Sequence, residues 1–384
     1  ADVPFGVFLS GGVDSSANVA LMSELMTQPV RTFTVGFHDS KELNELESAR
    51  AISQRFGTNH HEVMIGRAEM LKFLPELVFH QDEPIADPVC VPLYYVSKLA
   101  RDTGTIVVQV GEGSDEIFAG YDWFRTYLKI EERFWRHAER MPLAARRAAS
   151  ALARPLVKKV LKKRMASELV RRLGANESLF WGGAVVFDET MKSSVLSPEM
   201  RGRYDRLSTH DVVRQYLETI ASARPDSDYA ARMTYLELKL RLPELLLMRV
   251  DKITMATSVE ARVPFLDHHL IEYAMGLPRS LKVKGATGKH ILKRALESVL
   301  PPDVLYKPKR SFGAPINEWF RGPEGRNLVK QLMNSSIRER NFFEYSFVGR
   351  MADEHARETR DWSANLWCLL NLSLWYERWI ARAD

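Results

Sequence analysis

Apolar runs alternate with amphipathic stretches in the first third of the chain. Short apolar runs predict strands at 3–9, 30–35, 60–64 and 106–110. Helical periodicity predicts helices at 17–26, 45–56, 68–80 and 92–101, the second of them closed by Gly57. Strands that alternate with helices in this way are typical of a parallel sheet covered by helices on both faces. The pattern therefore predicts an α/β fold.

The second half of the chain has a different pattern. From Tyr121 onward strand signals fade, and helical periodicity interrupted by prolines dominates to Ala383. We expect residues 1–130 to form the α/β core and residues 131–384 to form a mostly helical part of the same domain. Parallel sheets bind ligands at the carboxyl ends of their strands. Ser10, Val35 and Gly111 fall at predicted strand ends, which indicates a ligand site there.

Composition restricts the class of protein. The 384 residues are 45% hydrophobic and 27% charged, as in ordinary globular proteins. No apolar run approaches the roughly 18 residues of a spanning helix, and the start of the chain does not resemble a signal peptide. Two cysteines, Cys90 and Cys368, cannot build a disulfide framework or a metal cluster. We therefore expect a cytoplasmic protein without a membrane partner.

The net charge of +5 is concentrated in one segment, residues 133–172. Such a segment could bind nucleic acid, an anionic membrane or a partner protein. However, the aromatic and glycine patterns of nucleic-acid modules do not accompany it. We favour a solvated helical face and expect no nucleic-acid partner. The buried stripe of that face would comprise Leu156, Val157, Val160 and Leu161.

The most informative motif is Ser10-Gly11-Gly12-Val13-Asp14-Ser15-Ser16, which follows an apolar run and precedes a helix. A strand, a glycine turn and a helix N-terminus together form an anion site. Glycine lets the backbone N–H groups approach a phosphate, the serines add hydroxyl donors, and an aspartate can hold Mg²⁺. The alternative is an ordinary structural turn. The motif predicts a loop that binds pyrophosphate, as in enzymes that cleave ATP between the α and β phosphates.

A second motif, residues 110–121, places Glu112, Asp115 and Glu116 directly after a strand. Three carboxylates so close together repel one another unless cations or donors offset their charge. A complex of Mg²⁺ and ATP would provide that offset. The alternative is an acidic helix start, in which the carboxylates favour the helix dipole.

Charged and apolar residues interleave in two further stretches, 247–252 and 258–267. We expect Asp251, Glu260 and Arg262 to form structural ion pairs near the core. Basic stretches follow at 289–294 and 306–313. The second of these stretches contains proline and glycine and is expected to form a loop. A lysine held by this basic loop could stabilise the departing pyrophosphate, although a single lysine is usually solvated.

Together with Val35-Gly36-Phe37, these stretches, in their order along the chain, closely resemble the synthetase domain of the glutamine-hydrolysing asparagine synthetase family. The family shows Ser-Gly-Gly-x-Asp-Ser, Val-Gly-Phe, Gly-Glu-Gly-x-Asp-Glu, Glu-Ala-Arg-Val-Pro-Phe-Leu-Asp and Pro-Lys-x-x-Phe, and the resemblance covers nearly the whole chain. It implies a parallel sheet of the adenine nucleotide α-hydrolase type with a PP-loop, followed by a helical C-terminal lobe.

The resemblance also implies the roles of individual residues. Leu9 and Val35 would contact adenine, Gly111 would lie against the ribose, and Asp14 and Asp115 would share Mg²⁺ and pyrophosphate. The catalytic residues would be Glu112, beside the acyl-adenylate and the incoming ammonia, and Lys309, which would neutralise charge on the phosphates. The full set of implied ATP-binding residues is Leu9, Ser10, Gly11, Gly12, Asp14, Ser15, Ser16, Val35, Val110, Gly111 and Lys289.

Three features depart from the family pattern. The chain begins Ala1-Asp2 and not with the nucleophilic cysteine of the glutaminase half, so we expect that domain to be absent here and present in the parent protein. Val110 replaces a serine of many relatives, which removes a possible side-chain contact to ribose. The loop with Asp82 and Asp87 lacks serines that relatives often carry, so the acceptor acid stays open. Relatives that close β-lactam rings tend to have tyrosine in place of Glu112, so this residue favours amidation.

The sequence therefore predicts an ATP- and Mg²⁺-dependent ligase. Aspartate would be adenylated, and ammonia, from glutamine in the parent protein, would displace AMP to give asparagine. Another small acid, a peptide or a sugar is the alternative acceptor, and a non-enzymatic nucleotide-binding scaffold is the alternative of a different class. Sulfur transfer is set aside because Cys90 and Cys368 lie outside every motif. We expect small-molecule substrates and the glutaminase domain as partners, and a second copy of the chain, in a homodimer, is a further prediction.

Overall fold

A computed structural model describes residues 3–160, 164–204, 207–308 and 312–381. Five parallel strands form one sheet in the order β3-β2-β1-β4-β5. Their bounds are β1 (Phe5–Phe8), β2 (Arg31–Phe37), β3 (Asn59–Ile65), β4 (Val107–Gln109) and β5 (Glu260–Arg262). The predicted α/β class, a parallel sheet with helices on both faces followed by a helical lobe, is confirmed.

The helices of the first third alternate with the strands as predicted. They are α1 (Val13–Leu25), α2 (Leu46–Phe56), α3 (Arg67–Gln81), α4 (Cys90–Asp102) and α5 (Ser114–Ile117). Gly57 ends α2 in the left-handed conformation, with φ of 60°. Helix α1 begins four residues before the predicted start at Ala17, so that Asp14 belongs to its first turn.

The rest of the chain is mostly helical within the described residues. A first group comprises α6 (Asp122–Ile130), η1 (Glu131–Trp135), α7 (Arg136–Glu139), α8 (Leu143–Val160), α9 (Arg164–Ala175), α10 (Glu189–Val195), α11 (Pro198–Tyr204), α12 (Thr209–Ala223), α13 (Tyr229–Leu236) and the π-helix η2 (Glu237–Leu247). A second group comprises α14 (Met248–Met255), η3 (Pro264–Leu266), α15 (His268–Gly276), α16 (Arg279–Lys282), α17 (His290–Ala295), α18 (Pro302–Leu305), α19 (Ile316–Trp319), α20 (Gly322–Met333), η4 (Ser336–Arg340), α21 (Tyr345–Ala356) and α22 (Ser363–Trp379).

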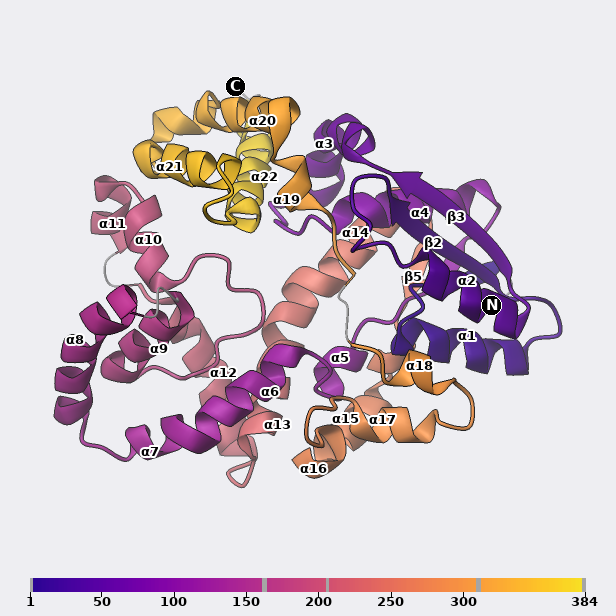
Figure 1. The fold of residues 1–384 in the computed structure, drawn as a ribbon, viewed down its shortest axis with the longest axis horizontal. Coiled ribbons are helices and arrows are strands. Elements are labelled where there is room, and N and C mark those ends of the chain that lie inside the picture. The colour runs from indigo at the N-terminus through magenta and orange to yellow at the C-terminus, as the bar shows by residue number, and fades with distance from the viewer. Residues whose placement is uncertain (1–2, 161–163, 205–206, 309–311, 382–384) are drawn as a thin grey trace.

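Two hydrophobic cores cover the two faces of the sheet. One joins strand residues such as Phe33 to α3, α4, α14 and α22. The other joins strand residues such as Val7 to α1, α2, α15 and α18. Figure 1 shows the sheet at one end of the molecule and α8 to α11 at the other, with α19 to α22 along one side. The two cores fix the carboxyl edge of the sheet against the helical part.

Two details of the sheet differ from the sequence predictions. Val35 does not end its strand, because β2 continues to Phe37 and pairs there with Ile65 of β3. The short strand β5 was missed: Ala261 pairs with Val108 of β4, although it lies within a stretch that we expected to be helical. Three residues, Glu-Ala-Arg, are too few to show the alternation that marks a strand.

Candidate active site

A cavity of about 510 Å³ opens at the carboxyl edge of the sheet. Loops and helices from segments far apart in the sequence contribute to its wall, from Phe8 to Phe312. The predicted site residues on this wall are Leu9, Ser10, Gly12, Asp14, Ser15, Val35, Val110, Gly111, Glu112, Asp115 and Lys289. Gly11 and Ser16 lie in the same loop but do not line the cavity, and Lys309 lies outside the described residues.

The loop after β1 has the conformation that an anion-binding turn requires. Gly11 has a φ of +67°, and a Cβ there would lie 2.6 Å from Ser48, so only glycine fits. Gly12 is the N-cap of α1, which leaves the first backbone N–H groups of that helix without intrahelical partners. The hydroxyls of Ser10 and Ser15 lie 3.1 Å apart beside them. The loop thus presents N–H and O–H donors on one edge of the cavity.

Two carboxylates lie next to this loop and share one ammonium. The Lys289 Nζ atom lies 2.7 and 2.6 Å from the two oxygens of Asp14 and 2.8 Å from Oδ1 of Asp115. The Ser114 hydroxyl donates to Asp14 at 2.7 Å. Lys289 is only 4% exposed. Burial opposes its charge, but Asp115 and Asp14 outweigh burial and raise the pKa of the ammonium.

The donor set of Asp14 and Asp115 suits a magnesium ion that arrives with a nucleotide. Among the described residues, no group of three or more His, Cys, Asp or Glu side chains could hold a metal by itself. Mg²⁺, however, is usually held by one or two carboxylates together with substrate phosphates and water. Both carboxylates line the cavity beside the loop, so the residues fit such an ion, with Lys289 as a third group at the same point.

Glu112 lies in a buried chain of charges. The Arg249 guanidinium donates to Oε1 of Glu112 and to Oδ2 of Asp87, both at 2.6 Å. Arg249 is 6% exposed; although burial opposes its charge, Asp87 and Glu112 raise the pKa of the guanidinium. Of the two Glu112 oxygens, only Oε1 has a hydrogen-bond partner within the described residues. The arginine thus fixes the carboxylate of a residue that lines the cavity and leaves Oε2 without a hydrogen bond to the described residues.

Glu116 lies behind the cavity wall in a second buried cluster. It is 1% exposed, accepts a hydrogen bond of 2.7 Å from the Tyr121 hydroxyl, and lies 3.4 Å from Arg241. Arg241 also pairs with Glu237 at 3.1 Å and stacks on the Tyr121 ring. Burial, followed by the charges of Asp115 and Glu112, raises the pKa of Glu116 to about 7. The three neighbouring acids of the motif at 110–121 therefore each have a partner within the protein.

The raised pKa of Glu116 predicts a pH-dependent stability. The folded protein holds this proton more tightly than the unfolded chain, whose ordinary value is 4.5, so stability falls as pH rises through about 7. Glu116→Gln, which cannot ionise, should gain up to about 3 kcal/mol relative to wild type over this range. Urea unfolding between about pH 5 and pH 8 measures the difference. Glu272→Gln, at an exposed position, serves as the control; equal slopes for the two variants would contradict the assignment.

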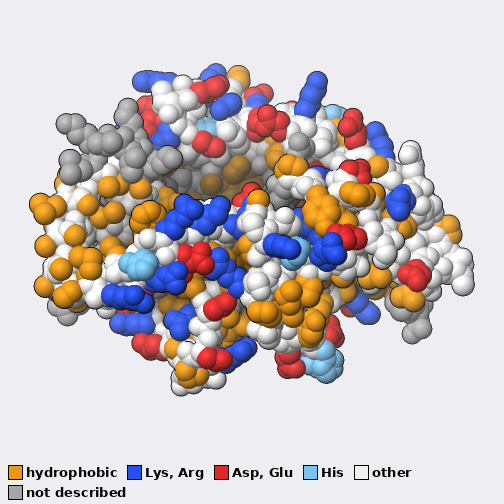
Figure 2. Space-filling model, turned by 60° about the horizontal axis from the view of Figure 1, so that its bottom comes forward, with side chains coloured by type: hydrophobic (Ala, Val, Ile, Leu, Met, Phe, Trp, Pro, Cys, Tyr) orange, Lys and Arg blue, Asp and Glu red, His pale blue; other side chains and the backbone are white. Residues whose placement is uncertain are grey.

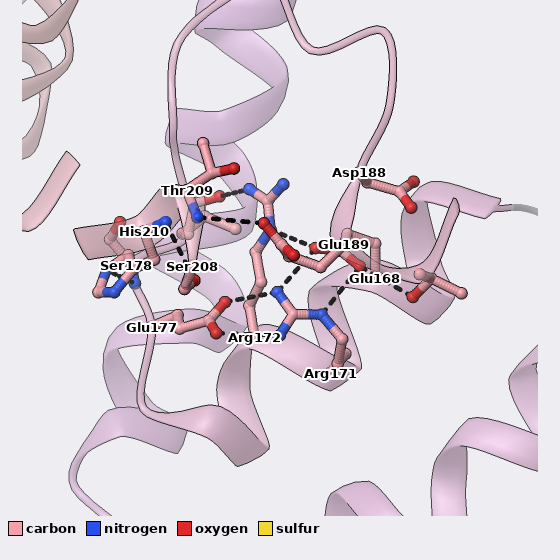
Figure 3. Close-up of polar contacts among 12 residues, drawn as sticks. Glu168, Arg171, Arg172, Glu177, Ser178, Asp188, Glu189, Ser208, Thr209 and His210 are labelled. Carbon is pink, nitrogen blue, oxygen red and sulfur yellow. Dashed lines mark hydrogen bonds and ion pairs between the residues drawn. The ribbon is translucent and has the colours of Figure 1, made fainter. Parts of the chain in front are cut away.

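The basic segment 133–172 ends in a structural network, shown in Figure 3. Arg171 bridges Glu168 and Glu177, and Arg172 donates to Glu168 at 3.1 Å while its guanidinium lies 3.9 Å from the Trp181 ring centroid. These two arginines therefore support the fold of the helical part and do not form a solvated face. Of the expected buried stripe, Val157 is half-buried. The side chains of Leu156, Val160 and Leu161 lie outside the described residues.

Two further expectations about charge are corrected. Glu260 and Arg262 pair with each other at 2.9 Å, but both side chains are more than half exposed and not near the core. Asp251 is also exposed.

On the face drawn in Figure 2, basic and acidic side chains are interspersed. Within the described residues, no helix combines the length and apolar character needed to cross a membrane.

Sequence reasoning missed several charged groups of the cavity. Arg249 belongs to a motif that we singled out, but no role was predicted for it. Arg125, Arg241 and Lys293 also line the cavity, from α6, η2 and α17. The motif around Arg249 and the basic stretch 289–294, which contains Lys293, could have drawn attention to these two residues. Arg125 and Arg241 lie in helices outside every motif that we singled out.

Comparisons with known proteins agree with this geometry. The asparagine synthase family model matches residues 1–377. A putative glutamine-hydrolysing asparagine synthetase of Mycobacterium bovis is 35% identical over 98% of this chain and 55% of its own length. The glutamine-hydrolysing asparagine synthetase 1 of Bacillus subtilis is 31% identical over 98% of this chain and 56% of its own. Amidase chyE of Penicillium rubens is 26% identical over 90% and 54%. The chain thus spans about half the length of the curated relatives it matches.

Proposed function

The chain belongs to the asparagine synthase family of amide-forming ligases, and from this membership and the geometry of the cavity we propose that it adenylates a carboxylic acid with ATP. An oxygen of the acid attacks the α-phosphorus, the bond to the bridging oxygen of the β-phosphate breaks, and pyrophosphate leaves. Ammonia then attacks the acyl carbon, loses a proton, and displaces AMP to give the amide. Aspartate is the proposed acceptor and asparagine the proposed product.

One observation carries this proposal. A single cavity joins the glycine loop, the carboxylates of Asp14 and Asp115, and the carboxylate of Glu112. The first two features suit a triphosphate with Mg²⁺, which when bound would neutralise phosphate charge. The third suits an incoming ammonia molecule. An enzyme that couples ATP cleavage to amide formation needs all three within reach of one another.

The residues on the wall divide the proposed task. Leu9 and the Val35 backbone would hold adenine, and Gly111 would lie against the ribose, where Val110 offers no hydroxyl. The loop donors would bind the phosphates. Glu112, oriented by Arg249, would accept a proton from ammonia through Oε2. Activation of the acid needs positioning and charge neutralisation and no covalent nucleophile, so these groups suffice.

Two residues and one domain belong to this proposal without a direct observation in the structure. Lys309 would neutralise charge that develops on the phosphates. Ser16, whose buried hydroxyl lies behind the loop, would support the loop. Relatives of this chain are named glutamine-hydrolysing and are about twice as long. We therefore propose that a glutaminase domain of the full-length protein supplies the ammonia.

The decisive experiment is ATP–pyrophosphate exchange with a panel of carboxylic acids, followed by AMP formation when ammonium is added. Exchange that depends on aspartate would support asparagine synthesis. Exchange with another small acid, a peptide or a sugar would support the second candidate acceptor. Release of inorganic phosphate in place of pyrophosphate, with every acid, would contradict the adenylation.

A further inference from the structure

Lys293 differs from the other buried cations of the cavity. Lys289, Arg241 and Arg249 each lie within 3.4 Å of at least one carboxylate. Lys293 is half-buried and also lines the cavity, yet it forms no ion pair with any described residue. Its ammonium lies over the Tyr306 ring, 5.6 Å from the ring centroid. Its charge is therefore available to a ligand.

A second cation, Arg125 of α6, also lines the cavity. It pairs with Asp122 at 2.6 Å, but that aspartate side chain is 69% exposed, so water screens the pair. Burial, then Lys289 and Arg125, lower the pKa of Lys293, while the charges of Asp14 and Asp115 act in the opposite direction. Within the described residues neither Lys293 nor Arg125 forms an ion pair with a buried carboxylate, so an anion in the cavity would stabilise both cations.

The position of this site indicates which anion it suits. The backbone N–H of Lys293 donates to the carbonyl of Lys289 at 2.9 Å, so the two lysines lie one helical turn apart. Lys289 contacts the carboxylates beside the glycine loop, and Lys307 donates to the carbonyl of Gly11 at 2.7 Å. Cationic groups therefore continue from the loop along the wall, as a chain of linked phosphates requires.

We propose that Lys293 and Arg125 form a subsite for the β and γ phosphates of ATP and hold the pyrophosphate after the acid is adenylated. This inference rests on the proposed function, because only cleavage next to the α-phosphate leaves pyrophosphate in the cavity. Arg125 comes from α6 and Lys293 from α17, so two helices far apart in the sequence contribute to the proposed subsite (Figure 1).

Direct binding measurements test the subsite separately from catalysis. Isothermal titration of pyrophosphate and of AMP, each with Mg²⁺, should show that Lys293→Met weakens pyrophosphate binding about 10- to 100-fold, the loss expected for one charged hydrogen bond. Binding of AMP, which lacks the β and γ phosphates, should change less than about twofold. Lys293→Arg should restore most of the pyrophosphate affinity. Arg294→Met is the matched control. Arg294 is the next residue in the sequence, but its side chain is 64% exposed, pairs with Glu297 and does not line the cavity.

Arg125→Met provides a second test that does not depend on the folding of the Lys293 variants. It should weaken pyrophosphate binding in the same selective manner. Wild-type pyrophosphate affinity in both methionine variants, or an equal loss of AMP affinity, would overturn the subsite. Its failure is distinguishable from failure of the proposed function: in the first case wild type still releases pyrophosphate with a suitable acid, and in the second it does not.

Discussion

Asp14→Asn should lower acid-dependent pyrophosphate release about 10³-fold. The substitution removes one of the two carboxylate charges beside the glycine loop and leaves Lys289 with Asp115 as its remaining carboxylate partner. Preorganised electrostatic groups commonly contribute a factor of about 10²–10³ each to the rate. Loss of a carboxylate that binds the metal ion lowers the rate further. Pyrophosphate release measured across a range of Mg²⁺ concentrations gives the effect.

The control for this prediction is Asp102→Asn. That aspartate ends α4, is 58% exposed, and pairs only with Lys98 on the surface among the described residues. It should keep the wild-type rate. If Asp14→Asn also keeps that rate, or if its response to Mg²⁺ is unchanged, the proposed role of the two carboxylates is wrong.

The position of Lys289 bears on how this site works. Its ammonium contacts both carboxylates that we propose to hold Mg²⁺. Without a nucleotide, the ammonium offsets the repulsion between Asp14 and Asp115. In the proposed complex with phosphates and their cation, the same ammonium would interact with the phosphate charge. One buried lysine can thus stabilise the free site and also contribute to the bound one.

The glycine loop was the part of the site most accessible to sequence reasoning. Strand, glycine turn and helix follow one another directly, so local pattern is enough to predict their geometry. The start of α1 at Val13 was missed because Asp and Ser are weak helix formers. Their place in the first turn strengthens the anion site, since it brings the free N–H groups of the helix to the loop.

The ion pairs around the cavity could not be predicted in this way. Arg249 and Arg262 belong to neighbouring motifs of interleaved charged and apolar residues, and we expected Arg262 to be the buried one. The structure shows the reverse: Arg249 is buried and Arg262 is exposed at β5. The partners of Arg249, Asp87 and Glu112, lie 162 and 137 positions away from it in the sequence. Burial there depends on how distant segments pack, which no local pattern records.

This contrast between the two arginines gives the second large prediction. Arg249→Met should reduce the free energy of unfolding by about 3–5 kcal/mol, because it leaves Asp87 and Glu112 without the buried cation between them. Arg262→Met removes the same charge from an exposed pair and should cost no more than about 1 kcal/mol. Urea unfolding of both variants at one pH measures the difference.

A further variant separates the loss of packing from the loss of charge balance. Asp87→Asn in the Arg249→Met background removes one of the two uncompensated acids, so it should recover part of the lost stability. Amide formation should not recover, because Glu112 would still lack the guanidinium that fixes its carboxylate through Oε1. Equal stability of Arg249→Met and Arg262→Met would show that the buried chain of charges does not hold this wall of the cavity.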